Sequence, residues 1–373
     1  MSQESREGRE ARLRETIEKI KPLDKKAVEK AQHRIDVLTK PPGSLGRMEE
    51  LAVQLAGIEG DFFPVNTRKR VVVMAADHGV TEEGISAFPG DVTLQMVANF
   101  TSQGAAINVF SNLEGAEVEV VDVGVASDPD LPGVKKVRIK PGTDNFRRGQ
   151  AMSRDEVLQA LLAGVESAEK AAEEGIKVLA TGEMGIGNTT ASSAVTAALT
   201  HYQVSLVVGR GTGLDDDELL HKQQVVEKAL ELHRPDPSDA VEVLEKVGGL
   251  EIAALTGLIL GGAARGIPVI VDGFISTTAA LAAVKIQPEV KNYLVPSHLS
   301  QESGHGLLLD YLDLQPYINM NMRLGEGTGA VLAMNLVEAA ARVTVQMATF
   351  EDAGVSRGEE EKESSGQTEG EKN

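Results

Sequence analysis

The sequence contains no cysteine and no tryptophan, and only 3% of its 373 residues are aromatic. Without cysteine the chain forms no disulfide, has no thiolate nucleophile and binds no metal through sulfur. The best candidate for a membrane span, residues 252–264, is short and rich in alanine and glycine. Charges of both signs fill the first 20 residues, unlike the basic and apolar pattern of a signal peptide. We therefore expect a soluble, cytoplasmic protein.

Positive charge is also in short supply. The chain has 37 Lys and Arg against 56 Asp and Glu, a net charge of −19. An acidic surface repels nucleic acids and anionic membranes, so neither is an expected partner. A small anionic substrate can still bind where backbone amides or a few basic side chains outweigh the overall field. The composition therefore favours small-molecule partners.

Short β-branched segments alternate with longer helical patterns through most of the chain. The expected strands are apolar throughout, which is typical of a parallel sheet covered on both faces. We predict an α/β fold, a Rossmann-like doubly wound sheet, over residues 66–325. A small helical domain is expected from both chain ends, the N-terminal helices of 1–65 and a C-terminal helix at 326–350. Residues 351–373 are predicted to form a disordered acidic tail.

The expected strands and helices can be placed by residue number. Strands are predicted at 70–75, 118–123, 177–180, 204–208, 268–271 and 293–295. Helices are predicted at 45–58, 92–111, 154–174, 189–199, 216–232, 238–246, 252–265, 276–284 and 329–345. Four of these strands run into glycine-bearing loops. Ligands of such sheets bind beyond the carboxyl ends of the strands, so we expect the site there.

One carboxylate near the C-terminal end stands between glycines, in Leu-Gly-Glu-Gly-Thr-Gly at 324–329. The glycines let a ligand approach the backbone closely around Glu326. In a poorly solvated turn the pKa of this carboxylate would rise toward the range of a general base. The alternative is an ordinary helix start, with Thr328 as its cap and Glu326 stabilised by the helix dipole. The hexapeptide alone leaves both interpretations open.

The segment 182–190 favours an anion-binding loop. Gly185 and Gly187 can present successive amides, and Asn-Thr-Thr at 188–190 offers donors at a helix start. The segment is not a P-loop, because no Gly-Lys-Ser/Thr ends it. A plain strand–turn–helix connection is the alternative. Glu183 is either a structural hydrogen-bond acceptor or a ligand contact.

Other polar segments are weaker signals. The acids at 215–218 suggest either a divalent metal or a helix start, and the helix dipole favours the second. Lys222, two turns further on, either reaches an anion or is solvated. Only His298 and His305 lie near each other, and no HExxH pair occurs, so no metal or other cofactor is expected.

Taken together, these segments resemble the nicotinate-nucleotide–dimethylbenzimidazole phosphoribosyltransferase family, which makes the lower-ligand nucleotide of cobalamin. The resemblance covers about residues 38–340. The segments that carry it are 39–46 (Thr-Lys-Pro-Pro-Gly-Ser-Leu-Gly), 75–80, 84–89, 104–107, 182–190, 209–213, 271–274 and 323–329. Several long motifs in the right order make the resemblance specific.

The resemblance implies transfer of phosphoribose from nicotinate mononucleotide to 5,6-dimethylbenzimidazole, giving α-ribazole 5′-phosphate and nicotinate without a metal. Glu326 falls on the family's general base. Phosphate- and ribose-binding positions fall on Glu183, Gly185, Gly187, Asn188, Thr189 and Lys222, and base-binding positions on Ser86, Phe88 and Gln95. The resemblance also implies a homodimer. The sequence departs from the family at Ser303, where relatives usually have proline, which leaves the base preference open.

Two other functions stay open at this point. One is the same transfer to another base, such as adenine, a different benzimidazole or a phenol. The other is a non-catalytic protein that binds nicotinate mononucleotide and does not need Glu326.

Overall fold

Six parallel strands form one sheet in the computed structural model, which describes residues 5–127, 130–211 and 213–356. The strands are β1 (Arg68–Ala76), β2 (Glu117–Gly124), β3 (Val134–Lys136), β4 (Ile176–Met184), β5 (Val269–Val271) and β6 (Leu294–Pro296). Their spatial order is β3-β2-β1-β4-β5-β6, the order typical of Rossmann folds. The predicted fold class is confirmed. The chain changes direction across the sheet between β1 and β4, where this fold binds its ligands.

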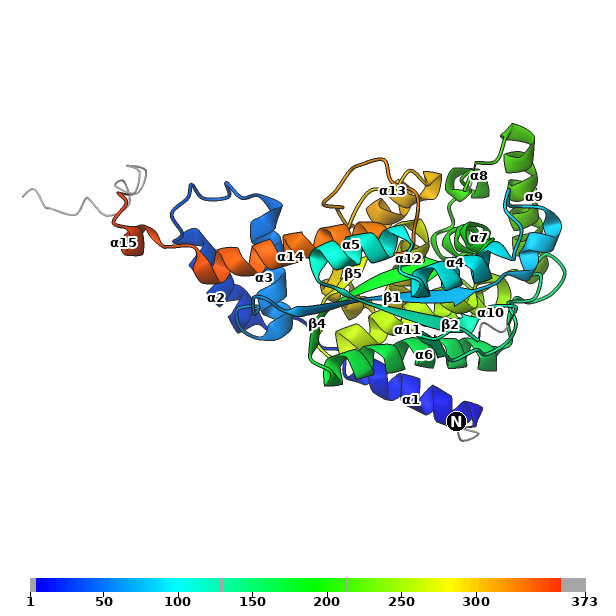
Figure 1. The fold of residues 1–373 in the computed structure, drawn as a ribbon, viewed down its shortest axis with the longest axis horizontal. Helices are drawn as coiled ribbons and strands as arrows, with labels where there is room; N and C mark the ends of the chain where they lie inside the picture. The colour runs from blue at the N-terminus through cyan, green and yellow to red at the C-terminus, as the bar shows by residue number, and fades with distance from the viewer. Residues whose placement is uncertain (1–4, 128–129, 212, 357–373) are drawn as a thin grey trace, which may run out of the picture. The chain divides into compact units, whose positions relative to one another are not determined.

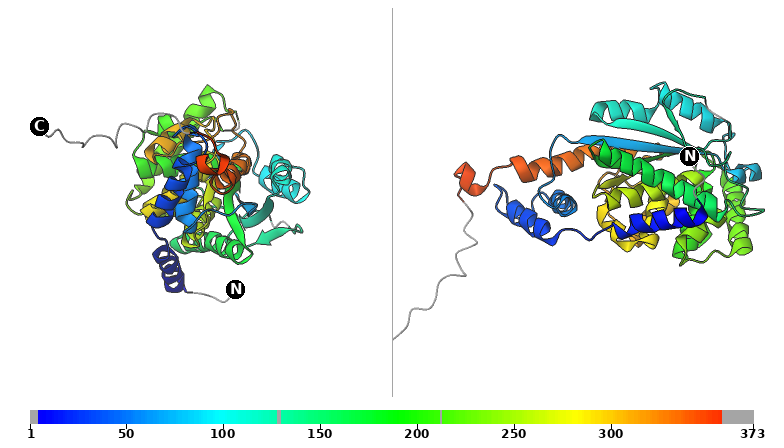
Figure 2. Two further views of the ribbon diagram at one scale, coloured as in Figure 1. Left: turned by 90° about the vertical axis from the view of Figure 1, so that its left-hand side faces the viewer. Right: turned by 90° about the horizontal axis from the view of Figure 1, so that it is seen from below.

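Helices cover both faces of this sheet. Those that follow the strands are α4 (Val92–Thr101), α5 (Ala106–Glu114), α6 (Arg154–Glu173), α7 (Asn188–Thr200), α8 (Val204–Val207), α9 (Asp216–His233), α10 (Ala240–Val247), α11 (Leu250–Ala264), α12 (Phe274–Ile286) and α13 (Ser303–Tyr311), with 3-10 turns η1 (Gly79–Glu83) and η2 (Pro288–Tyr293). Figures 1 and 2 show α6 and α11 on one face and α4 and α5 on the other. Every residue of α11 except Ala264 is buried, because the helix lies between α6, α12 and the sheet.

The chain divides into two compact units. Of the described residues, the larger contains 5–23 and those between 66 and 338, and the smaller contains 24–65 and 339–356. The smaller unit holds α2 (Lys25–Asp36), α3 (Arg47–Glu59), the end of α14 (Thr328–Gln346) and α15 (Phe350–Ala353). Within it, Leu38 pairs with Thr349, and the Arg34 guanidinium donates to the carbonyls of Thr344 and Met347. Segments from both chain ends are thus joined by backbone and side-chain hydrogen bonds.

The unit boundaries differ from the predicted ones at the N-terminus. Helix α1 (Arg6–Glu18) belongs to the larger unit, where Arg9 pairs with Asp155 at 2.9 Å and Arg12 with Glu166 at 2.7 Å. These ion pairs attach α1 to α6. The prediction placed all of 1–65 in the small domain, whereas residues 5–23 group with the larger unit. Of the predicted acidic tail, residues 351–353 are helical, while 357–373 lie outside the described residues.

Two predicted elements need correction, and one strand was not predicted. Residues 204–207 form the short helix α8 instead of a strand, because the segment packs between α7 and α13, away from the sheet. The single helix predicted at 92–111 is two helices, since Gln103 has a φ of +61° and breaks the run. The edge strand β3 was missed because it is short and carries two lysines.

Two other helices answer questions that the sequence raised. Helix α14 is long and apolar enough to cross a membrane, but 56% of its most apolar window is buried in the protein, as in a core helix. The acids at 215–218 begin α9. Asp215 accepts from the Glu218 amide and Glu218 from the Asp215 amide, each at 2.9 Å. This capping box confirms the helix-start interpretation.

The contact between α6 and α11 generates a stability prediction. A Cβ added at Gly257 would overlap the backbone of Leu161, so Gly257→Ala forces the helices apart. We expect a loss of about 1–3 kcal/mol in the free energy of unfolding, measured by urea titration. The matched control is Gly306→Ala in α13, where the nearest atom would lie at an ordinary 3.8 Å. Equal stability of the two variants would contradict this account of the packing.

Candidate active site

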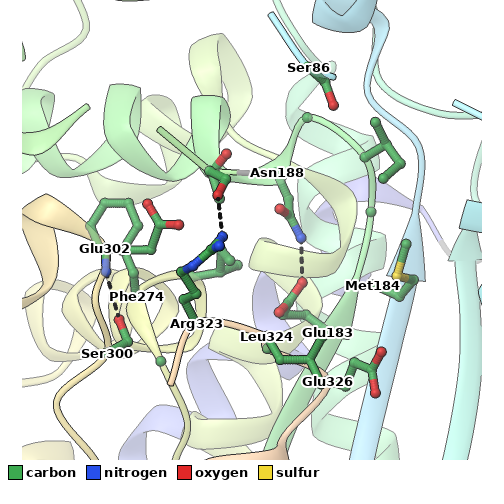
Figure 3. A pocket seen from close by; sticks show the side chains of 18 of the residues that line it. Ser86, Glu183, Met184, Asn188, Phe274, Ser300, Glu302, Arg323, Leu324 and Glu326 are labelled. Carbon is green, nitrogen blue, oxygen red and sulfur yellow. Dashed lines mark hydrogen bonds between the residues drawn. The ribbon is translucent and has the colours of Figure 1, made fainter. Parts of the chain in front are cut away.

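A cavity of about 460 Å³ opens at the carboxyl ends of the central strands. Its walls come from the loops after β1, β4, β5 and β6 and from the segment before α14. Every predicted site residue except Gln95 lines it. Figure 3 shows Glu183 and Glu326 together on one side, with Arg323 and Glu302 on the other. The cavity thus lies at the carboxyl ends of the strands around the switch point between β1 and β4.

The turn that carries Glu326 has three successive residues with left-handed φ. The angles are +84° at Gly325, +63° at Glu326 and +91° at Gly327. Glycine adopts this conformation freely, but for Glu326 it costs about 1–2 kcal/mol. A side chain at position 325 would overlap the Glu183 carboxyl group. The glycines on both sides are therefore required by the geometry of the turn.

Two buried carboxyl groups hold this turn through its backbone. Asp272 accepts from the amide of Gly327 at 3.1 Å and from that of Ala330 at 2.9 Å. The amide of Glu326 donates to the Glu183 carboxyl group. Thr328, predicted to cap the helix, instead donates its hydroxyl to the carbonyl of Gly325 at 2.8 Å. The cap of α14 is Asp272, a residue from the end of β5.

The Glu326 side chain is suited to accept a proton. It is 5% exposed, and its Oε2 has no hydrogen-bond partner among the described residues. Burial raises the pKa of this carboxyl group, and the nearby charge of Asp272 raises it further. The amide of Ile107, at the start of α5, donates to the carboxylate and opposes the shift. These properties of Glu326 favour the catalytic interpretation of residues 324–329 over that of an ordinary helix start.

Glu183 lies beside this turn and is held on two sides. The Asn188 side-chain amide donates to its Oε2, and the Glu326 backbone donates from the turn. Burial raises the pKa of Glu183 to about 8, and the charges of Asp272 and Glu251 add to the effect. Glu183 is accordingly protonated at neutral pH. Through these two hydrogen bonds Glu183 joins the turn at 325–327 to the loop after β4.

Basic side chains gather at the other end of the cavity. The Lys222 ammonium is buried and donates to Thr189 Oγ1 at 2.9 Å and to the Gly209 carbonyl at 3.2 Å. Burial lowers its pKa to about 8. Arg323 donates to the carbonyl of Gly211 at 3.3 Å, and Arg210 lines the same region. This end is suited to an anion.

The loop of residues 185–190 adds backbone donors to that end. Gly187 has a φ of +96° and precedes the first turn of α7, whose N-terminus lines the cavity. The amide of Ile186 donates to Thr93 Oγ1 at 3.1 Å, which fixes the loop to α4. A helix N-terminus beside a buried lysine is a favourable place for a phosphate group.

The third part of the cavity is mostly apolar. Ser86 and Phe88 line it, and Phe88 is 50% exposed at its mouth. Helix α4 contributes Val92 and Met96, four residues apart on one helix face. Gln95, which was predicted to bind the base together with Ser86 and Phe88, is exposed on α4 and does not line the cavity. An adjacent helical position points about 100° away, which places Gln95 off this face.

Comparisons with known proteins agree with one another. The sequence model of the phosphoribosyltransferase family matches residues 20–355. A relative from Chloroflexus aggregans is 54% identical over 349 residues, which cover 93% of this chain and 99% of the relative. One from Roseiflexus sp. is 54% identical over 345 residues, 92% of this chain and 98% of the relative. Both are named nicotinate-nucleotide–dimethylbenzimidazole phosphoribosyltransferase.

A solved structure gives the same result. The enzyme of that name from Thermus thermophilus superimposes with a TM-score of 0.85 at 48% identity, covering 90% of this chain and all of that one. The chain belongs to the nicotinate-nucleotide–dimethylbenzimidazole phosphoribosyltransferase family. The predicted family is confirmed.

In this family member, sequence reasoning missed several residues of the site. Asp272 was noticed only as part of a glycine-bearing loop, because the two backbone amides that donate hydrogen bonds to it lie 55 and 58 residues later in the sequence. Arg323, three residues before Glu326, was also missed as a cation of the cavity. Its signal was present, since it is the basic residue that opens the segment 323–329.

The histidine of α13 has structural hydrogen bonds. His305 accepts from the Ser300 amide at 3.0 Å and contacts Thr277 Oγ1 at 3.0 Å, and burial lowers its pKa to about 3. His305 is therefore neutral. Over residues 5–127, 130–211 and 213–356, no group of three or more His, Asp or Glu side chains is arranged to hold a metal ion.

Glu183 generates a prediction about the pH dependence of stability. Its pKa is about 8 in the folded chain, against an ordinary 4.5. Between these values only the folded chain holds the proton, so this group's stabilisation is complete below about pH 4.5 and is lost as the pH rises to about 8. Glu183→Gln keeps the neutral form. We expect urea titrations to show the wild type losing stability relative to this variant over that range, and a constant difference would contradict the assignment.

Proposed function

We propose that this chain transfers phosphoribose from nicotinate mononucleotide to 5,6-dimethylbenzimidazole, giving α-ribazole 5′-phosphate and nicotinate. The names of the relatives support this activity. The observation that carries the proposal is Glu326, a buried carboxylate with one oxygen unbonded within the described chain, held by its backbone at the edge of a cavity whose far end is basic. That arrangement suits a substrate with a phosphate at one end and an N–H to be lost at the other.

The donor phosphate is assigned to the basic end. Lys222, Thr189 and the N-terminus of α7 would hold it, with Gly185, Gly187 and Asn188 shaping the loop. Glu183 stands between this loop and Glu326, where the ribose would lie. Arg323 adds a second cation. With these contacts, C1 of the ribose would lie within the cavity, toward Glu326.

The acceptor base is assigned to the apolar part. Ser86 and Phe88, with Val92 and Met96, form walls that suit a flat, weakly polar ring such as a benzimidazole. A contact of Gln95 with the base stays a prediction from the resemblance. The choice among benzimidazoles, purines and phenols depends on these walls and on the loop that contains Ser303.

The chemistry needs one proton acceptor. The donor carries a cationic pyridinium, so its departure as nicotinate neutralises charge. A ring nitrogen of the acceptor forms the new bond to C1 as the C1–N bond to the pyridinium breaks, through an oxocarbenium-like transition state. Attack from the opposite face converts the β-nucleotide into the α-ribotide. The acceptor's N–H proton passes to Glu326, and holding both substrates in line supplies much of the remaining rate.

The expected homodimer and cytoplasmic location belong to the same proposal. The net charge of −19 supports small-molecule partners over nucleic acid or membrane.

Glu326→Gln tests the proposal. The amide keeps the shape of the side chain but takes up no proton, so we expect nicotinate release from nicotinate mononucleotide and dimethylbenzimidazole to fall about 10²–10⁴-fold. The matched control is Glu289→Gln, in η2 and outside the cavity, which should keep wild-type activity. If the activity of Glu326→Gln stays within about threefold of wild type, Glu326 is not the general base. A wild type that binds the mononucleotide but yields no product with any base would instead favour the non-catalytic alternative.

A further inference from the structure

A buried ion pair lies next to the cavity without lining it. His78 Nε2 and Glu251 Oε1 are 2.8 Å apart, and both side chains are 0% exposed. His78 follows the end of β1, and Glu251 is in the first turn of α11. Burying two charges is costly unless the pair is well placed, and replacing such a pair with apolar side chains is often neutral or stabilising. The presence of the pair is therefore only weak evidence for a stabilising role.

His78 packs directly against the loop that we assign to the phosphate. A Cβ added at Gly185 would lie 3.3 Å from His78 Nε2, and one at Gly187 would lie 3.2 Å from His78 Cβ. Both glycines thus lie close to this side chain, while the atoms nearest to the two Cβ positions are the Ala76 carbonyl oxygen and Thr81 Cγ2, the latter at 3.0 Å.

His78 is itself held from several sides. Its carbonyl accepts from Thr81 Oγ1 at 2.7 Å, and the following amide, of Gly79, donates to the carbonyl of Thr143 at 3.0 Å. A Cβ at Gly249 would lie 2.5 Å from His78 Cε1, so the chain before α11 closes on the ring from another direction. Glu251 then fixes the ring's orientation through Nε2.

The charge state is consistent with this geometry. Burial alone would lower the pKa of His78, but the carboxylate of Glu251 outweighs burial and the pKa is raised. The same carboxylate contributes to the raised pKa of Glu183. His78 therefore contacts the loop, and Glu251 acts on Glu183.

We propose that His78 and Glu251 are positioning residues that set the location of the 185–187 loop, and so the affinity for the phosphate of the donor. Neither side chain touches substrate. The inference rests on the proposed function, because it needs a phosphorylated donor at this loop.

The test compares the Michaelis constants of the two substrates. For His78→Gln and Glu251→Gln we expect the KM of nicotinate mononucleotide to rise about tenfold, with kcat within about threefold and the KM of dimethylbenzimidazole within about twofold of wild type. Glu251→Gln keeps the size and an acceptor oxygen, so it remains informative if His78→Gln does not fold. A purely structural role would lower the melting temperature without this split between substrates.

Two further variants separate the possible failures. Glu49→Gln breaks another buried ion pair, Lys40–Glu49 at 2.9 Å in the smaller unit, and should leave both KM values unchanged. Lys222→Met removes the assigned phosphate cation and should raise the donor KM selectively. If only Lys222→Met does so, the inference about His78 and Glu251 is overturned and the phosphate site stands. If no variant raises the KM of the donor, both the inference about His78 and Glu251 and the assignment of the phosphate site are overturned. A wild type without transferase activity overturns the proposed function itself.

Discussion

The carboxylate of Asp272 is the contact on which the site depends most. It is 2% exposed and receives two backbone amides from the start of α14, so it caps a helix that follows it by more than 50 residues. A buried carboxylate without donors would be strongly destabilising, and a left-handed glutamate costs about 1–2 kcal/mol. Each problem is offset by the other, because the left-handed turn directs the amide of Gly327 at the carboxylate. Glu326 is held at the cavity by its backbone, which leaves an oxygen of its side chain available for chemistry.

The cations of the cavity gather at one end, away from Glu183 and Glu326. Three buried acids, Glu183, Asp272 and Glu326, lie at or behind one end, while Lys222 and Arg323 lie at the other, where Glu302 is the acid that faces them. Burial and the crowding of these acids raise the pKa values of Glu183 and Glu326, and the raised pKa makes Glu326 a better proton acceptor. The basic end offsets the net charge of −19 locally, so that an anionic substrate can enter. The same separation orients a substrate that carries a phosphate at one end only.

Much of this arrangement could be predicted from the sequence, and the reasons differ by residue. The strands and the loops after them follow from apolar runs that end in glycine, and a local motif identified Glu326 and the 182–190 loop. Asp272 could not be assigned, since its partners lie on a distant helix start. Helix α8 was mistaken for a strand because valines favour strands, whereas packing between α7 and α13 decided the outcome. Gln95 lies outside the cavity because it is one residue away from Met96 on α4, and neighbouring helical positions point in different directions.

The central claim is that Asp272 serves catalysis by holding Glu326, and a double-mutant cycle tests it most directly. Nicotinate release would be measured for Asp272→Asn, Glu326→Gln and the double variant, each checked for folding. If Asp272 acts through Glu326, Asp272→Asn lowers kcat/KM about tenfold or more in the wild type and less than about twofold in the Glu326→Gln background. Equal losses in both backgrounds would contradict the account, because Asp272 would then act independently of the turn.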